Sequence, residues 1–162
     1  MQIKIAHPAF QQQQLAVAAA GLLSAPCLFL NGKKIAGQKG NYTVQNDAGD
    51  SVVVRLQRIY PDPIPRVTID GAAIEIARPL AWYSYAWAAL PVLLLFSGGT
   101  FGIAGNLLGG VIGVTGTYLN LRILRKDDIA ILRYWASLLV TLGAYIAFAI
   151  VITLVQALTA KS

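Results

Sequence analysis

The residues able to carry chemistry are few and scattered in this chain. The sequence has one histidine, His7, and one cysteine, Cys27, and neither has partners at the spacing of a metal site or a nucleophile–base pair. The run GGTFGIAG has the spacing of a loose nucleotide fingerprint, but it follows no predicted strand, and no Walker A sequence is present. We therefore predict no catalytic residues, no metal, no cofactor and no enzymatic activity.

Glycines in the stretch GGTFGIAGNLLGGVIGVTG form the most informative pattern. Six of them recur in steps of 4, 3, 4, 4 and 3 and share one helical face: Gly98, Gly102, Gly105, Gly109, Gly113 and Gly116. Asn120 continues this face one turn later. Each glycine destabilises a helix in water by about 0.8–1 kcal/mol, whereas in lipid a smooth glycine face lets a second helix approach closely. We call these seven residues the glycine seam, and predict a helix-packing surface used within one chain or between chains.

Three further polar residues in this region are candidates for lining a conduit: Asn106, Thr115 and Thr117. No charged residue lies in the interior of the apolar segments, although such charges are the usual mark of an ion or proton path. Hydrogen bonding between helices, worth roughly 0.6 kcal/mol per bond, is the commoner use of such side chains. We favour helix packing and keep a conduit as the alternative.

Basic residues gather where the second and third apolar segments meet: Arg122, Arg125, Lys126 and Arg133. Each would attract anionic lipid headgroups by about 1 kcal/mol. Asp127 and Asp128 partly neutralise this charge. We interpret the cluster as a topology anchor, with lipid binding as the alternative.

Composition indicates an integral membrane protein. The 162 residues are 56% hydrophobic and 12% charged, with a mean hydropathy of +0.60, whereas soluble domains have roughly 25% charged residues. The net charge of +6 does not indicate nucleic-acid binding, because the first 79 residues hold eight basic against five acidic side chains and no aromatic platform among basic residues. The expected partners are the lipid bilayer and other membrane helices.

Residues 1–79 are predicted to form a β-rich domain, a small antiparallel β-sandwich or open barrel. Alternating apolar residues and turn chemistry predict strands near 3–6, 15–19, 27–30, 33–36, 42–45, 52–58, 66–69 and 73–77. Asn31-Gly32 and Asp70-Gly71 are typical of two-residue hairpin turns, and residues 47–50 connect a third hairpin.

Residues 80–162 are predicted to form a domain of three transmembrane helices, at about 80–96, 100–121 and 129–158. The first has 17 residues, the short limit for crossing about 30 Å of hydrocarbon, and Pro91 is expected to kink it. Three crossings place twelve basic residues on one side against Lys161 on the other, so the positive-inside rule predicts a cytoplasmic β-domain. Aromatic residues of an interfacial belt gather towards the same side: Trp82, Tyr83, Tyr85, Trp87, Tyr118, Tyr134 and Trp135.

Several segments together carry a resemblance: PRVTIDGAAIEIARPLAWYSYAW, then LPVLLLFSGGTFGIAGNLLGGVIG, then the exit TYLNLRILR and a final apolar helix. In this order the chain resembles a loose group of small uncharacterised bacterial membrane proteins with an N-terminal β-rich domain and a glycine-rich transmembrane helix. The likeness is strongest over residues 65–125, and the LNGKKI hairpin belongs to the same pattern. It implies a multi-pass protein of the bacterial inner membrane and implies no activity.

Three functional hypotheses follow. The first is a non-enzymatic accessory or structural subunit of an inner-membrane complex, which packs through the glycine seam against itself or a larger complex and offers sheet edges to a partner. A homo-oligomeric channel or transporter component is the second. An immunity or regulatory protein that acts on a membrane partner is the third.

Overall fold

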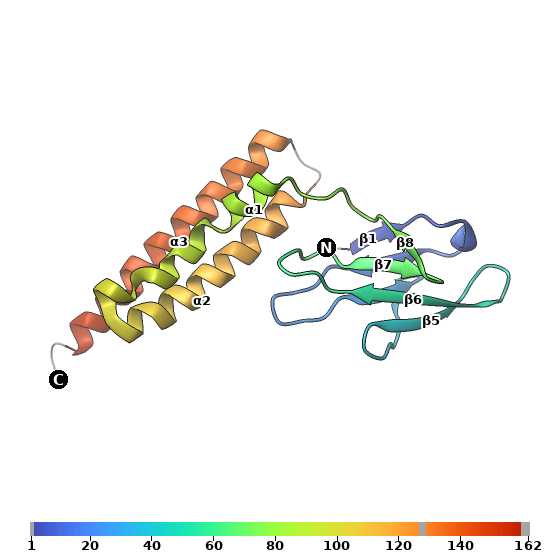
Figure 1. The fold of residues 1–162 in the computed structure, drawn as a ribbon, viewed down its shortest axis with the longest axis horizontal. Coiled ribbons are helices and arrows are strands. Elements are labelled where there is room, and N and C mark those ends of the chain that lie inside the picture. Colours follow the sequence, from blue (N-terminus) through green and yellow to red (C-terminus); the bar gives the residue numbers. More distant parts are fainter. Residues whose placement is uncertain (1, 127–128, 160–162) are drawn as a thin grey trace. The chain divides into compact units, whose positions relative to one another are not determined.

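The computed structural model of this chain describes residues 2–126 and 129–159, and the side-chain packing of residues 98–100 lies outside that description. Two compact units follow one another along the chain, Met1–Pro79 and Leu80–Ser162 (Figure 1). The first unit is built of strands, and the second of helices.

Two four-stranded antiparallel sheets make up the first unit. One has the order β1-β2-β3-β4, with strands Gln2–Ile5, Leu15–Ala18, Cys27–Leu30 and Lys33–Lys34. The other has the order β5-β6-β7-β8, with strands Asn41–Gln45, Ser51–Gln57, Arg66–Ile69 and Ala72–Ile74. Within each sheet, strands that are consecutive in sequence pair with one another, and every predicted strand has a counterpart within a few residues of its expected ends.

Two hairpin turns confirm the turn chemistry expected from the sequence. Asn31 and Gly32 have φ values of 51° and 77°, and Asp70 and Gly71 have 48° and 84°. A type I′ turn requires positive φ at both central residues, which asparagine, aspartate and glycine tolerate better than other residues. The Asp70 carboxylate also accepts a hydrogen bond from the Val53 amide at 2.9 Å, which ties the turn to β6.

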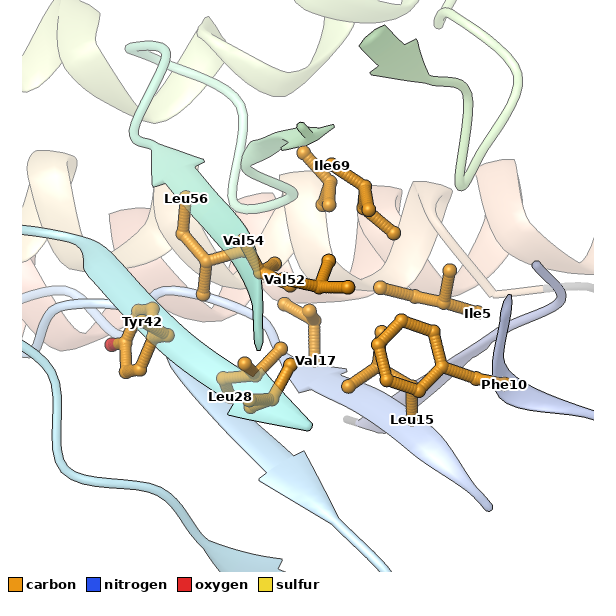
Figure 2. Packing of buried hydrophobic residues seen from close by; sticks show 12 residues of the cluster. Ile5, Phe10, Leu15, Val17, Leu28, Tyr42, Val52, Val54, Leu56 and Ile69 are labelled. Carbon is orange, nitrogen blue, oxygen red and sulfur yellow. The ribbon is translucent and has the colours of Figure 1, made fainter. Parts of the chain in front are cut away.

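A single apolar core joins the two sheets, as in a β-sandwich (Figure 2). Alternate residues of β6 are buried, and the exposed residues between them face outward. The buried cluster takes side chains from both sheets: Ile5, Phe10, Leu15, Val17, Leu28, Tyr42, Val44, Val52, Val54, Leu56, Val67 and Ile69. Of the two architectures expected, the sandwich is the one observed.

Tyr42 sits at the margin of this core. Its ring packs against Gly37, where a side chain would collide with the ring, and its hydroxyl donates a hydrogen bond to the Pro26 carbonyl at 3.1 Å. Burial, and secondly the neighbouring Cys27 thiol, raise the pKa of Tyr42 above its ordinary value of 10.0. The phenol therefore keeps its proton to a higher pH in the folded domain than in the unfolded chain.

The second unit departs from the predicted first transmembrane helix. Instead of one helix over 80–96, the chain forms α1 (Trp82–Ala88) and then a 3₁₀ helix, η2 (Leu90–Ser97). Pro91 explains the break, because it has no N–H to donate and its ring clashes with the carbonyl four residues earlier. The chain thus forms two short helices where one helix kinked at Pro91 was predicted, and a third membrane span is not confirmed.

Two long helices follow, α2 (Gly98–Leu124) and α3 (Ala130–Thr159). Gly102 interrupts α2 with φ 64° and ψ −155°, a conformation open mainly to glycine. Among the described residues, two helices are long and apolar enough to cross a membrane, Phe101–Leu124 and Ala130–Thr159. They correspond to the second and third predicted segments.

Candidate functional site

The two side chains with the most reactive chemistry have local structural roles. The His7 Nδ1 atom accepts a hydrogen bond from the Ala9 amide at 3.2 Å and caps the short 3₁₀ helix η1, Pro8–Phe10. The Cys27 thiol is partly buried and lies 3.6 Å from the Ala25 carbonyl oxygen. Over residues 2–126 and 129–159, no three His, Cys, Asp or Glu side chains gather as a metal site would require.

The glycine seam packs on η2 of the same chain. A Cβ atom built on Gly109 would lie 2.7 Å from the carbonyl carbon of Leu94, and one on Gly113 would lie 2.5 Å from the Pro91 oxygen. Such distances are too short for real contacts, so these two positions admit only glycine unless the backbone moves. The close approach has the form expected of small-residue packing between membrane helices.

Residues at the ends of the seam make different contacts from those at its centre. At Gly116 a Cβ would lie 3.0 Å from the Pro91 Cβ and 3.4 Å from that of Ala144, so this glycine meets both η2 and α3. Gly105 backs onto Ser97, whose hydroxyl donates to the Gly105 carbonyl at 3.0 Å. Gly102 has open space around it, and its positive φ produces the break in α2. The packing of Gly98 lies outside the described part of the structure.

Asn120, the last residue of the seam, bonds to the broken helix. Its Nδ2 atom donates to the Ala88 carbonyl at 3.4 Å, and the Tyr145 hydroxyl donates to the Leu90 carbonyl at 3.2 Å. In a 3₁₀ turn the Ala88 carbonyl would accept from position 91, where proline has no N–H to donate. The Asn120 side chain thus supplies a donor to this carbonyl, and Tyr145 adds a hydrogen bond from α3 to η2.

Polar side chains connect the three α-helices of this unit, and we define them as the polar cluster: Ser84, Asn120, Ser137 and Thr141, which are buried, and Tyr134, which is partly buried. The Asn120 Nδ2 atom donates to the Thr141 hydroxyl at 2.9 Å, and that hydroxyl donates to the Ser137 carbonyl at 3.0 Å. The hydroxyls of Ser84 and Tyr134 lie 3.0 Å apart. The cluster therefore links α1, α2 and α3 by neutral hydrogen bonds.

Not every polar atom in this region has a partner. The buried atoms Asn120 Oδ1, Ser137 Oγ, Thr117 Oγ1 and Trp87 Nε1 make no hydrogen bond. In the cluster and beside it, the groups are amides, hydroxyls and an indole, which position helices but supply no carboxylate, imidazole or thiol for acid–base chemistry.

The sequence analysis did not identify Ser84, Tyr134 and Ser137 as members of this cluster. The spacing of four between Ser137 and Thr141 is the signal that would have placed two polar groups on one face of α3.

The residues considered for a conduit do not lie on one surface. Asn106 and Thr115 are exposed on α2, and Thr117 is partly buried. Nine residues separate Asn106 from Thr115, which is two and a half turns, so they point to opposite sides of the helix. One α2 helix would not present both of them to the same channel.

Arg133 has a more specific position than the rest of the basic cluster. Its Nη1 atom donates to the carbonyls of Leu124 and Lys126, at 3.1 and 3.0 Å. A cation at the end of a helix bonds the last carbonyls and interacts favourably with the helix dipole. Arg133 therefore caps α2 and holds the start of α3 against it.

The other basic residues remain nearer to the surface. Arg122 lies over the Tyr118 ring at 5.9 Å and is exposed, as is Lys126, while Arg125 is partly buried. Asp127 and Asp128, predicted to neutralise this charge, lie outside the described residues.

Two tryptophans of the predicted interfacial belt are exposed: Trp82 is 80% exposed and Trp135 is 60% exposed. The hydrogen bond between Ser84 and Tyr134 places the starts of α1 and α3 at the same end of the unit.

An apolar groove lies between η2 and α3. Its lining combines apolar side chains with three hydroxyl groups: Leu93, Leu94, Phe96, Ser97, Phe101, Tyr145, Phe148, Ala149, Ile152 and Thr153. The rings of Phe101 and Phe148 meet edge to face, with centroids 5.8 Å apart. The groove is suited to an acyl chain or a hydrophobic helix and has no charged group to hold a polar ligand.

Comparison with known proteins adds no family to this description: no protein-family model, curated protein or solved structure matches the chain.

Proposed function

We propose that this chain is a non-enzymatic accessory or structural subunit of a bacterial inner-membrane complex. In this proposal the helical unit lies in the bilayer, and the β-sandwich lies on the cytoplasmic side, where it meets a partner. The glycine seam stabilises the helical unit itself, and the contact with the partner uses the outer surface of α3.

The exposed apolar surface of α3 is the observation that carries this proposal. Its apolar stretch is only 17% buried, and large apolar side chains are exposed all around the helix except on the one face that packs against the rest of the unit. Leu139, Ile146 and Leu154 are 67%, 60% and 58% exposed. A helix that is apolar all round is stable when lipid or other helices cover it, and would be costly in water.

A third crossing is also consistent with the contacts. Along α1 and η2, positions 97, 94, 91 and 88 meet α2 at positions 105, 109, 113 and 120, so the two stretches run antiparallel. Seven α-helical and eight 3₁₀ residues would extend about 26 Å, because the rise is about 2.0 Å per residue in a 3₁₀ helix and 1.5 Å in an α-helix. That length approaches the roughly 30 Å of hydrocarbon.

The proposed orientation in the membrane rests on the basic residues at one end of the helical unit. With three crossings, the chain enters α1 from the side that also holds Arg122, Arg125 and Lys126. Short basic connections stay in the cytoplasm, and exposed Trp82 and Trp135 at that end suit the headgroup region. The β-sandwich would accordingly be cytoplasmic.

The partner surface on α3 includes a gap that a second helix would fill. A Cβ built on Gly143 meets nothing within 4 Å, and Ala147, four residues later, is also exposed. Small residues four apart allow close helix packing. A bulky residue at Gly143 should therefore leave the monomer folded and block a partner helix.

Gentle extraction from the native membrane followed by native mass spectrometry tests the proposal. We expect one copy of the chain in a larger complex of fixed composition, and we expect Gly143→Leu to release it from that complex. Val111→Leu, at an exposed position on α2, is the matched control and should stay bound. A free monomer would contradict the proposal, and a homo-oligomer of fixed stoichiometry would favour a channel instead.

A further inference from the structure

One end of the β-sandwich gathers two loops and the exit of the chain. Loop 19–26 joins β2 to β3, and loop 58–65 joins β6 to β7. The two loops are in contact, because the Ala20 amide donates to the Pro63 carbonyl at 2.8 Å. Strand β8 ends at Ile74, which pairs with Val67 near the start of β7, so the chain leaves from this same end. We call it the exit end.

Four apolar or aromatic side chains project from the exit end, and we call them the apolar tip: Leu22, Leu23, Ile59 and Tyr60. They are 36%, 97%, 38% and 74% exposed, which leaves Leu23 almost entirely in solvent. The tip belongs to an ordered structure, since the Arg58 Nη2 atom donates to the carbonyls of Gly21 and Leu22 at 3.0 and 3.3 Å. The Arg58 guanidinium also stacks on the Tyr60 ring at 4.2 Å.

Charge differs between the two ends of the sandwich. Around the exit end lie four cations, Lys39, Arg58, Arg66 and Arg78, against two carboxylates, Asp62 and Glu75. Around the opposite end, the turns after β3, β5 and β7 bring three carboxylates, Asp47, Asp50 and Asp70, near two cations, Lys33 and Lys34. The end with the apolar tip is thus the positive end, which suits an anionic surface.

We propose that the apolar tip inserts into the interfacial region of an anionic lipid bilayer. This inference rests on the proposed membrane insertion of the helical unit. Only residues 75–81 separate β8 from α1, and seven extended residues reach about 25 Å at most. This short linker would hold the exit end near the bilayer surface. Insertion of Leu22 and Leu23 would then remove exposed apolar area from water. Little further entropy would be lost, because the linker already restricts the position of the domain.

Each group at the exit end has a suitable place in this arrangement. Leu22 and Leu23 enter the boundary between headgroups and acyl chains, and Tyr60 lies at the headgroup level, where aromatic rings are enriched. Arg58 and Lys39 face the anionic headgroups, and each nearby cation strengthens binding by about fivefold, equivalent to about 1 kcal/mol. The bilayer thus accounts for the apolar, aromatic and cationic groups together.

The test uses the full-length chain in vesicles of phosphatidylcholine and phosphatidylglycerol, in a Cys27→Ala background. An environment-sensitive fluorophore is attached at Ala25→Cys beside the apolar tip, at Ala48→Cys in the opposite turn, or at Leu139→Cys on exposed α3. Nitroxide-bearing lipid serves as the quencher. We expect strong quenching and a blue shift at positions 25 and 139, and neither at position 48.

Two variants sharpen this result. The double substitution Leu22→Ser with Leu23→Ser should lower quenching at position 25 to the level of position 48. Lys39→Asn, which preserves the positive φ of 50° at that residue, should lower the ratio of docked to free domain about fivefold in anionic vesicles.

The outcomes separate the two proposals. Quenching at position 139 with none at position 25 would overturn the inference and leave the proposed membrane insertion standing. A label at position 25 that is shielded from water but not quenched by lipid would assign the tip to a protein contact and also overturn it. Absence of quenching at position 139 would overturn the proposed function and the tether that depends on it.

Discussion

Replacing Gly109 by alanine tests whether the glycine seam holds the helical unit together. The added Cβ would lie 2.7 Å from the Leu94 carbonyl carbon and 3.0 Å from the Ser97 Oγ atom. The first obstacle is backbone, so no rotation of a side chain relieves the overlap. Either η2 must move away from α2, or the helices must shift along one another.

The size of the effect follows from two opposing contributions. Overpacking a close contact costs about 1–3 kcal/mol, and the upper end applies here because backbone must move. Replacing glycine by alanine within a helix stabilises that helix by about 1 kcal/mol. We therefore expect Gly109→Ala to destabilise the unit by about 2 kcal/mol, roughly a 30-fold change in the unfolding equilibrium. Gly143→Ala gains the same propensity and meets nothing within 4 Å, so it should be neutral or stabilising.

Tryptophan fluorescence measures this unit alone. All three tryptophans, Trp82, Trp87 and Trp135, belong to the second unit. The Trp87 and Tyr134 rings meet edge to face, with centroids 6.1 Å apart, so Trp87 emission should respond when α1 separates from α3. Unfolding in mixed detergent micelles by increasing dodecyl sulfate gives the free-energy difference between each variant and the parent chain.

Two results would refute the reasoning about the seam. If Gly109→Ala were as stable as the parent chain, the close approach of α2 and η2 would not limit the fold. If Gly143→Ala lost as much stability as Gly109→Ala, the effect would come from helix propensity and not from the contact with η2.

Two further predictions concern a hydrogen bond in each unit. Asn120→Leu removes the donor to the Ala88 carbonyl and should cost about 1 kcal/mol in the same detergent unfolding. Thr115→Leu, at an exposed position on α2, should change little, and equal losses would contradict the role of Asn120. Because burial raises the pKa of Tyr42, the folded β-sandwich binds more protons than the unfolded chain above about pH 10, and its stability should fall as pH rises from there. Tyr42→Phe loses the hydrogen bond to Pro26 but should flatten this decline in urea unfolding followed by far-UV circular dichroism, and an unchanged slope would exclude Tyr42 as its cause.

Local chemistry made the β-sandwich predictable. Asn31-Gly32 and Asp70-Gly71 favour positive φ through their own side chains, so each turn and the register of its hairpin are encoded within a few residues. Alternation along β6 likewise marks its buried face without reference to the partner sheet. The choice between a sandwich and an open barrel depended on how the two sheets met, which no short segment encodes.

The helical unit was less predictable from the same kind of reasoning. Composition and length identified α2 and α3 as apolar helices, since each property belongs to the segment itself. Pro91 was expected to kink a helix, but the hydrogen bonds that the broken stretch accepts from Asn120 and Tyr145 depend on how the other helices pack against it. Arg133 was expected as a topology anchor, and its contact with the end of α2 depended on how the second connection folds.

The sequence by itself determined which residues form strands, tight turns, apolar helices and a glycine-lined face, because those properties arise from neighbours along the chain. Only the tertiary structure decided what covers that face. The spacing of Gly109 and Gly113 is the same whether η2 or another chain packs there, and only the approach of the Leu94 and Pro91 backbones distinguishes the two cases. The tertiary structure likewise decided that the apolar tip forms. Leu22 and Tyr60 are far apart in sequence, and Arg58 contacts both of their loops only after the sheets have packed.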